Sequence, residues 1–171
     1  MLERQRGETV DRAMAIILEA KQVYKTYQRE GAPEVLALRG VDLVVQQGEF
    51  VAITGPSGCG KSTLLTVLSG LDLPSSGSVA IAGREITTSD EGELAQLRNQ
   101  EIGFVFQSFH LVASMTALEN VAFPAELAGD NQAVARAEAL LDQVGMSNRR
   151  DSFPHQLSGG EKQRVALCRA L

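Results

Sequence analysis

The spacing of hydrophobic and polar residues predicts strands in the first two thirds of the chain. Short apolar runs rich in β-branched residues and bounded by turn residues are typical of strands. We expect strands at residues 16–25, 36–45, 50–54, 78–82 and 102–106, with turns at 28–33 and 74–77. The runs at 50–54 and 102–106 are almost wholly apolar, so these two strands are expected to be buried on both faces.

Apolar residues at helical spacing predict five helices. We expect them at 61–69, at 90–100 with Leu94 and Leu97 facing inward, from the cap Thr116, from Asp130 or Asn131 to Gly145, and from about Ser158 onward. After Gln107 the pattern is helical throughout. The last helix still carries apolar residues where the sequence stops, and no Gly, Asn or Pro ends it.

The first thirteen residues are polar and show no sustained period. Met14 opens the first apolar run, so we interpret residues 1–13 as a tail or a mis-assigned start, and residues 14–171 as the domain. Mass spectrometry of the native N-terminus tests this interpretation.

Composition limits the class of protein. The 171 residues are 44% hydrophobic and 22% charged, which is typical of one globular domain and excludes a disordered or fibrous chain. A net charge of −5 disfavours nucleic acid as a partner. No signal peptide and no bilayer-spanning run is visible. The two cysteines, Cys59 and Cys168, lack metal-ligand spacing and indicate a reduced, cytosolic protein.

The first motif that carries chemistry follows the apolar run at 50–54. It fits the pattern G-x-x-x-x-G-K-[ST] between an expected strand and an expected helix, and it comprises Gly55, Pro56, Ser57, Gly58, Cys59, Gly60, Lys61, Ser62 and Thr63. Glycines let successive backbone N–H groups point at phosphate oxygens, and the helix N-terminus faces the same anion. Lys61 supplies a positive charge for the β- and γ-phosphates, and the Ser62 hydroxyl is suited to ligate Mg²⁺. The motif therefore predicts a nucleotide site.

A second glycine pair precedes the last expected helix. Ser158, Gly159 and Gly160 again offer a hydroxyl and a helix N-terminus to an anion. The alternative is a plain capped helix start, with Ser158 as N-cap and Glu161 completing a capping box. The two interpretations are compatible, because an anion site at a helix start requires free N–H groups.

Three segments together resemble the ATP-binding-cassette (ABC) transporter ATPases: the GPSGCGKST loop, Gln107 in FVFQSFHL, and LSGGEKQRVALCRAL. ALENVAFP and LLDQVG resemble the lipoprotein-release, macrolide-efflux and cell-division branch of that family. The resemblance runs from about Ile16 to Leu171. It implies an α/β P-loop NTPase fold with a RecA-like core, an antiparallel β subdomain and a helical subdomain at about 108–157.

The resemblance also implies roles for single residues. Two cassettes pair head to tail in this family, so Ser158–Gly160 would contact the γ-phosphate of ATP held by the partner's loop. Gln107 resembles the glutamine that contacts Mg²⁺ and the attacking water. Tyr27 resembles the aromatic residue that stacks on adenine, with Tyr24 as the competing choice and strand packing as the plain alternative. Glu161 departs from the more usual glutamine, at a small electrostatic cost.

Two family elements are absent from the 171 residues. No apolar run ends in the Asp-Glu pair that holds Mg²⁺ through water and polarises the attacking water, and neither His110 nor His155 stands where the family's switch histidine belongs. We therefore interpret the chain as a fragment without the C-terminal part of the core. We expect it to be inactive as an ATPase, and poorly stable or aggregation-prone, because the run at 50–54 would lack neighbouring strands.

The resemblance implies an ATP-binding subunit that, when intact, couples hydrolysis of MgATP to a separate membrane permease. Export or the extraction of lipid or lipoprotein is the expected work, at the cytoplasmic face of the inner (plasma) membrane, in a homodimer or with a paired ABC subunit. Two alternatives stay open. One is a soluble ABC-type ATPase outside transport, and the other is a non-catalytic nucleotide-binding module.

Overall fold

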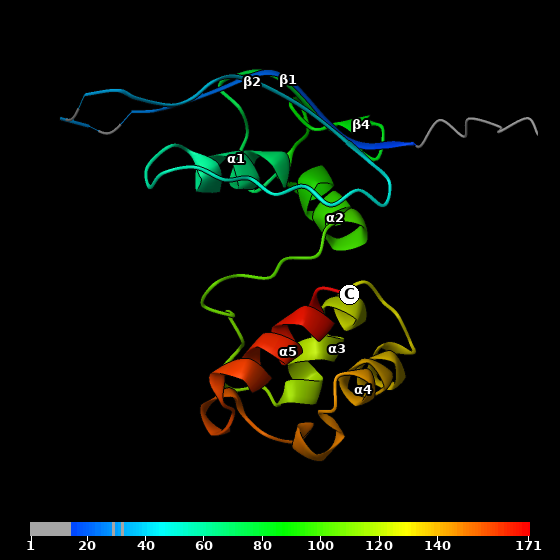
Figure 1. The fold of residues 1–171 in the computed structure, drawn as a ribbon. Coiled ribbons are helices and arrows are strands. Elements are labelled where there is room, and N and C mark those ends of the chain that lie inside the picture. The colour runs from blue at the N-terminus through cyan, green and yellow to red at the C-terminus, as the bar shows by residue number, and fades with distance from the viewer. Residues whose placement is uncertain (1–14, 29, 32) are drawn as a thin grey trace, which may run out of the picture. The chain divides into compact units, whose positions relative to one another are not determined.

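The computed structural model describes residues 15–28, 30–31 and 33–171. The chain divides into two compact units, residues 1–94 and residues 95–171, and each is described by itself (Figure 1). The expected tail at 1–13 and part of the expected turn at 28–33 lie outside the described residues.

The first unit contains a four-stranded antiparallel sheet in the order β2-β1-β3-β4. Its strands are β1 (Ile16–Tyr27), β2 (Val35–Gln46), β3 (Ser76–Ile81) and β4 (Arg84–Glu85). The strands expected from periodicity near 16, 36 and 78 are thereby confirmed, with bounds shifted by up to two residues. The two-residue strand β4 was too short for any periodicity to predict.

Two helices accompany this sheet. Helix α1 (Lys61–Leu68) lies along one face of the sheet, and α2 (Glu91–Glu101) follows β4 (Figure 1). Both helices and the burial of Leu94 and Leu97 confirm the prediction. The core of this part consists of strand residues, the residue after β4 and the inner side of α1, namely Ala20, Val23, Leu38, Val79, Ile81, Ile86, Val67 and Leu68.

The second unit is helical, as the pattern after Gln107 predicts. It contains α3 (Ala117–Leu127), α4 (Ala133–Gln143), the short 3₁₀ helices η1 (Ser147–Arg149) and η2 (Pro154–Gln156), and α5 (Gly159–Arg169). Its core is built from one face of each long helix and from two residues of the connecting segments, Met146 and Leu157. The helix residues are Ala117, Val121, Ala122, Ala133, Ala137, Leu141, Val165 and Cys168. The caps predicted at Thr116 and Ser158 are both present as capping boxes.

Asn120 is the one polar residue among the fully buried side chains of the described residues. Its amide oxygen accepts a hydrogen bond from Val112 N at 2.7 Å. Its amide nitrogen donates to the carbonyls of Val112, Met115 and Thr116 at 3.1, 3.0 and 2.9 Å. One side chain thus ties the segment before α3 to the helix itself, so a buried amide is fully satisfied.

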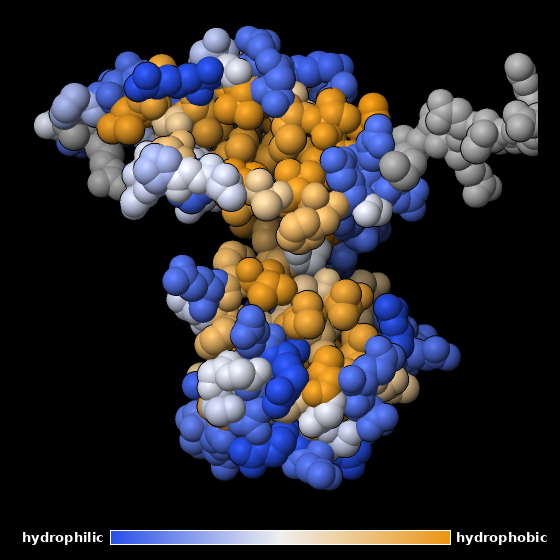
Figure 2. Space-filling model, in the orientation of Figure 1, coloured by the Kyte–Doolittle hydropathy of each residue, from blue (hydrophilic) through white to orange (hydrophobic). Residues whose placement is uncertain are grey.

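Two strand predictions are wrong. Residues 50–54 and 102–106 form no strand, and Phe50 is 92% exposed. A strand exists only where a neighbour accepts and donates its backbone hydrogen bonds, and no strand among the described residues pairs with either segment. Apolar content indicates that burial of a segment is favourable, but it does not show whether a neighbouring strand is available to pair with it. Hydrophobic side chains consequently gather at the surface of each unit (Figure 2).

Candidate nucleotide site

The loop before α1 has a backbone that requires glycine at two positions. Gly60 is the N-cap of α1 with φ of 95°, and a Cβ there would lie 2.6 Å from the carbonyl oxygen of Ala37 on β2. Gly55 has φ of 150°, and its Cβ would lie 2.8 Å from Cys59 Sγ. A side chain at either position would clash with these atoms and change the backbone conformation of the loop. The sequence motif therefore has a local structural cause.

The start of α1 offers unused hydrogen-bond donors. Gly60 provides no side-chain cap, and within the described residues the N–H groups of Gly60, Lys61 and Ser62 have no acceptor. The helix dipole places partial positive charge at the same point. Lys61 Nζ donates to the carbonyls of Gly55 and Pro56 at 2.8 and 2.7 Å, so its charge lies inside the loop. This arrangement can bind a phosphate chain.

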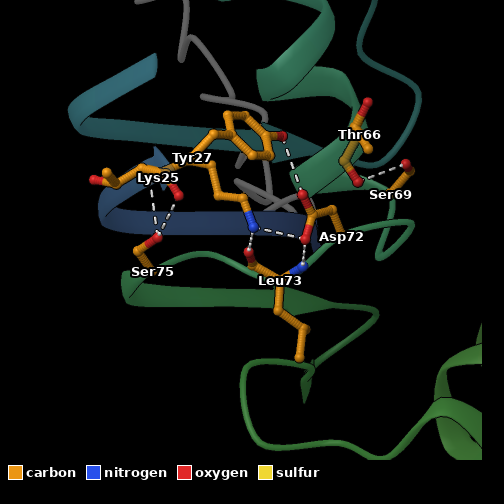
Figure 3. Close-up of polar contacts among 8 residues, drawn as sticks. Lys25, Tyr27, Thr66, Ser69, Asp72, Leu73 and Ser75 are labelled. Carbon is orange, nitrogen blue, oxygen red and sulfur yellow. Dashed lines mark hydrogen bonds and ion pairs between the residues drawn. The ribbon is translucent and has the colours of Figure 1, made fainter. Parts of the chain in front are cut away.

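Tyr27 belongs to the same unit, at the end of β1. Its hydroxyl donates to Asp72 Oδ2 at 3.0 Å, and Lys25 Nζ lies 5.0 Å from the ring centroid (Figure 3). The pKa of Tyr27 is raised by partial burial, by the hydrogen bond to Asp72 and by the negative charge of Asp72. A hydrogen bond with Thr63 in α1 acts in the opposite direction and lowers it. The phenol therefore stays protonated and keeps donating to Asp72.

Asp72 is ionised in this arrangement. Partial burial pushes its pKa upward, but hydrogen bonds from Lys25 and Tyr27, the charge of Lys25 and the N–H of Leu73 lower it below the ordinary value. Tyr24, the competing choice for base stacking, has its hydroxyl close to Gly40, where an added Cβ would lie 2.7 Å away. Tyr27 is therefore the tyrosine whose side chain is bonded to the segment after α1.

Gln107 and the Ser158 loop belong to the second unit. Gln107 is exposed in a turn, and the two residues that follow Ser108 have left-handed backbones, with φ of 60° at Phe109 and 47° at His110. Arg169, at the end of α5, donates to both of their carbonyls, at 2.8 and 2.6 Å. Because a non-glycine residue in this conformation is strained, the two charge-assisted hydrogen bonds hold a loop that would otherwise relax.

Ser158 starts α5 in the manner that the capped-helix interpretation predicts. Its hydroxyl accepts from Glu161 N at 3.4 Å and donates to the Glu161 carboxylate at 2.7 Å, while Ser158 N donates to that carboxylate at 2.7 Å. A Cβ added at Gly159 or Gly160 would meet nothing within 4 Å. Packing within the described residues therefore gives no reason for glycine here, which favours the approach of something from outside.

The carboxyl group of Glu161 in this loop has a strongly lowered pKa. Hydrogen bonds from the backbone and hydroxyl of Ser158, then from Arg149, lower its pKa to about 2. Arg149 Nε lies 3.0 Å from its carboxylate. A lowered folded-state pKa means that the cap contributes stability above the ordinary pKa near 4.5 and loses it as pH falls through about 2.

We expect a carbon-detected NMR titration of Glu161 to have its midpoint near 2. Arg149→Ala should move that midpoint upward, because it removes one of the three groups that stabilise the carboxylate. Glu119 caps α3 in the same way through Thr116, so its midpoint is the internal control and should not respond. A Glu161 midpoint at the ordinary value would contradict the capping geometry.

Comparison with known proteins identifies the family. The sequence model described as "ABC transporter" matches residues 38–171, a range that contains the glycine loop, Gln107 and the Ser158 loop. The chain belongs to the ABC transporter family.

Two relatives and one solved structure place this cassette more closely. The pyoverdine export ATP-binding/permease protein PvdT of Pseudomonas entomophila is 50% identical over 159 residues, which are 92% of this chain and 24% of PvdT. The lipoprotein-releasing system ATP-binding protein LolD of Xanthomonas campestris pv. campestris is 47% identical over 167 residues, 96% of this chain and 70% of LolD. The chain thus spans about a quarter of one relative and 70% of the other.

The dimeric ATP-binding cassette MJ0796, solved bound to ADP and Pi, superposes with a TM-score of 0.82 at 40% identity, over 91% of this chain and 69% of that one. The ABC cassette therefore has the α/β P-loop fold that the resemblance implies, with the antiparallel sheet beside helices. Among the described residues, no helix is both long and apolar enough to cross a bilayer.

Sequence reasoning missed three residues of this ABC cassette that hold its functional segments. Lys25 and Asp72 support Tyr27, and Arg169 holds the loop after Gln107. The only signal in the sequence was the position of Asp72 just after the P-loop helix. Nothing in a single sequence pairs residues 47 positions apart.

Proposed function

We propose that this chain is the nucleotide-binding part of an ABC transporter's ATP-binding subunit, and that it binds MgATP at the start of α1. The observation that supports this most strongly is the set of unpaired N–H groups of Gly60, Lys61 and Ser62 beside the Lys61 ammonium. Backbone donors, a helix N-terminus and a lysine charge together match the phosphate chain of a nucleotide.

Different residues around the site are proposed to bind different parts of MgATP. The N–H groups of the Gly55–Thr63 loop would bind the phosphate oxygens, and Lys61 would leave the two loop carbonyls to reach the β- and γ-phosphates. The exposed Ser62 hydroxyl fits the donor type that Mg²⁺ prefers, and Gln107 is proposed as a second ligand. When bound, the metal would neutralise phosphate charge. Tyr27 would stack on adenine.

Ser158, Gly159 and Gly160 are proposed to contact the γ-phosphate of a nucleotide bound by a second cassette. Their support is the helix start at α5 and the open space beside both glycines. ABC cassettes pair as dimers and work with membrane permeases, and MJ0796 is dimeric in its solved structure. We propose the same pairing here, at the cytoplasmic face of the membrane, with a permease for export or for lipid or lipoprotein extraction.

Within the 171 residues no Asp-Glu pair ends an apolar run, so we propose that this chain binds MgATP without turning it over. Calorimetry should give one MgATP per chain, and a phosphate-release assay should give no turnover. Turnover that survives purification and vanishes in Lys61→Ala would overturn the second half of this proposal. Absence of any MgATP binding would overturn the first.

Alkylation of Cys59 gives an independent check. Cys59 is exposed in the loop, 3.7 Å from Lys61 Nζ, whereas Cys168 is buried and burial raises the pKa of its thiol. N-ethylmaleimide should therefore modify Cys59 selectively and block MgATP binding, because the adduct occupies the phosphate cradle. Bound MgATP should protect the thiol from modification. The Cys59→Ser variant should bind MgATP, and N-ethylmaleimide should not change its affinity. Unchanged affinity after modification would place the nucleotide elsewhere.

A further inference from the structure

We propose that Asp72, together with Lys25, is a positioning element that fixes the ring of Tyr27 as the platform for the nucleotide base and aligns it with the phosphate cradle. This inference rests on the proposed function, in which Tyr27 stacks on adenine. It assigns roles to two residues that do not themselves touch the nucleotide.

The Asp72 carboxylate is fully used, and each of its oxygens has a separate task. Oδ1 accepts from Lys25 Nζ at 2.6 Å and from Leu73 N at 2.8 Å, while Oδ2 accepts from the Tyr27 hydroxyl at 3.0 Å. Lys25 Nζ also donates to the Leu73 carbonyl at 2.7 Å, and the Lys25 side chain is only 12% exposed. Figure 3 shows these groups converging between β1 and the segment after α1. Asp72 therefore cannot turn away without leaving a mostly buried ammonium without its carboxylate partner.

The segment that carries Asp72 is itself held at both ends. The N–H groups of Leu71 and Asp72 both donate to the Thr66 carbonyl near the end of α1, at 3.0 and 3.3 Å. Ser75 N donates to the Tyr24 carbonyl at 2.8 Å, and Thr26 N donates to Ser75 Oγ at 3.0 Å. Asp72 is thus fixed to α1 on one side and to β1, next to Tyr27, on the other.

This connection relates the two ends of the proposed ligand site. Helix α1 begins at the phosphate cradle and, over about 12 Å, leads to the segment that holds Tyr27. Lys25 Nζ lies over one face of the ring, so a base can stack only on the opposite face. A ring that is already oriented loses less rotational freedom on stacking, which favours binding of the base.

The test compares MgATP with magnesium tripolyphosphate, which has the phosphates and no base, by calorimetry on the full chain. Tyr27→Phe keeps the stacking ring and removes the hydroxyl, with its hydrogen bonds to Asp72 and Thr63. Asp72→Asn keeps the shape but replaces one acceptor oxygen with an amide group. We expect each variant to weaken MgATP binding about three- to tenfold and to leave tripolyphosphate binding within about twofold. The double variant should be no weaker than the weaker single variant, since both break the same connection.

Tyr24→Phe is the matched control, because Tyr24 lies on the same strand and its hydroxyl does not contact Asp72 in the described structure; its MgATP affinity should equal that of the unmodified chain. Full MgATP affinity in Tyr27→Phe, or additive losses in the double variant, would overturn the positioning role. Should Asp72→Asn not fold, Tyr27→Phe alone decides. If the unmodified chain binds MgATP no better than tripolyphosphate, or if Tyr27→Ala retains full MgATP affinity, the failure lies in the proposed base site instead.

Discussion

Lys61→Ala should weaken MgATP binding on the order of a hundredfold, the largest effect on ligand binding that we expect from any single substitution. Lys61 carries the only side-chain charge that the described loop directs at its own interior, where Nζ bonds the carbonyls of Gly55 and Pro56. Removing it leaves the phosphate oxygens with backbone donors alone. Calorimetry with MgATP and with tripolyphosphate measures the loss, which should be equal for both ligands.

Lys21→Ala is the control for this substitution. Lys21 lies on the sheet of the same unit, its side chain is 63% exposed, and it pairs with Glu19 rather than with the loop. Lys21→Ala and Lys61→Ala change the net charge by the same amount. A difference between them therefore reflects the position of the lysine and not the net charge of the chain. Equal weakening by both substitutions would mean that only the general charge of the chain matters, which contradicts a site at α1.

Asn120→Ala should lower the free energy of unfolding of the second unit by about 2–4 kcal/mol. The substitution removes the hydrogen bonds of a side chain that is 1% exposed, and it leaves the N–H of Val112 and the carbonyl of Met115 without that partner. The carbonyls of Val112 and Thr116 keep their backbone donors, Met115 N and Asn120 N. Urea denaturation followed by circular dichroism measures the change. MgATP affinity at α1 should stay unchanged where the unit is folded, because Asn120 lies outside the unit that holds α1.

Asn131→Ala provides the comparison. Asn131 is an exposed asparagine of the same unit, in the turn before α4. Its loss should change stability by less than about 0.5 kcal/mol. A small effect of Asn120→Ala, similar to that of Asn131→Ala, would show that the segment at residues 112–116 does not depend on the buried amide.

The parts of the fold that local pattern decides were predictable from the sequence. The glycines of the Gly55–Thr63 loop and the helix that follows come from backbone conformation and spacing. The capping boxes at Thr116 and Ser158 need only residues three positions apart. For the same reason the helices after Gln107 were placed within a few residues of their observed bounds.

What sequence reasoning could not reach depends on partners distant in the chain. The segment at 50–54 has the composition of a buried strand, yet a strand needs a neighbour that composition does not reveal. The contacts of Asp72 with Lys25 and of Arg169 with Phe109 join residues 47 and 60 positions apart. Such contacts appear only when the fold brings the elements together, and they support the functional residues without belonging to any motif.

The central claim is that unused N–H groups at the start of α1 bind the phosphates of ATP, and amide hydrogen exchange tests it most directly. Amide exchange in the peptide covering residues 55–63 should be markedly slower with MgATP than with magnesium alone. Lys61→Ala should abolish most of that protection at the same ligand concentration. The peptide covering α4 (Ala133–Gln143) should show no change. MgATP that binds the chain and leaves exchange at 55–63 unaltered would contradict the account.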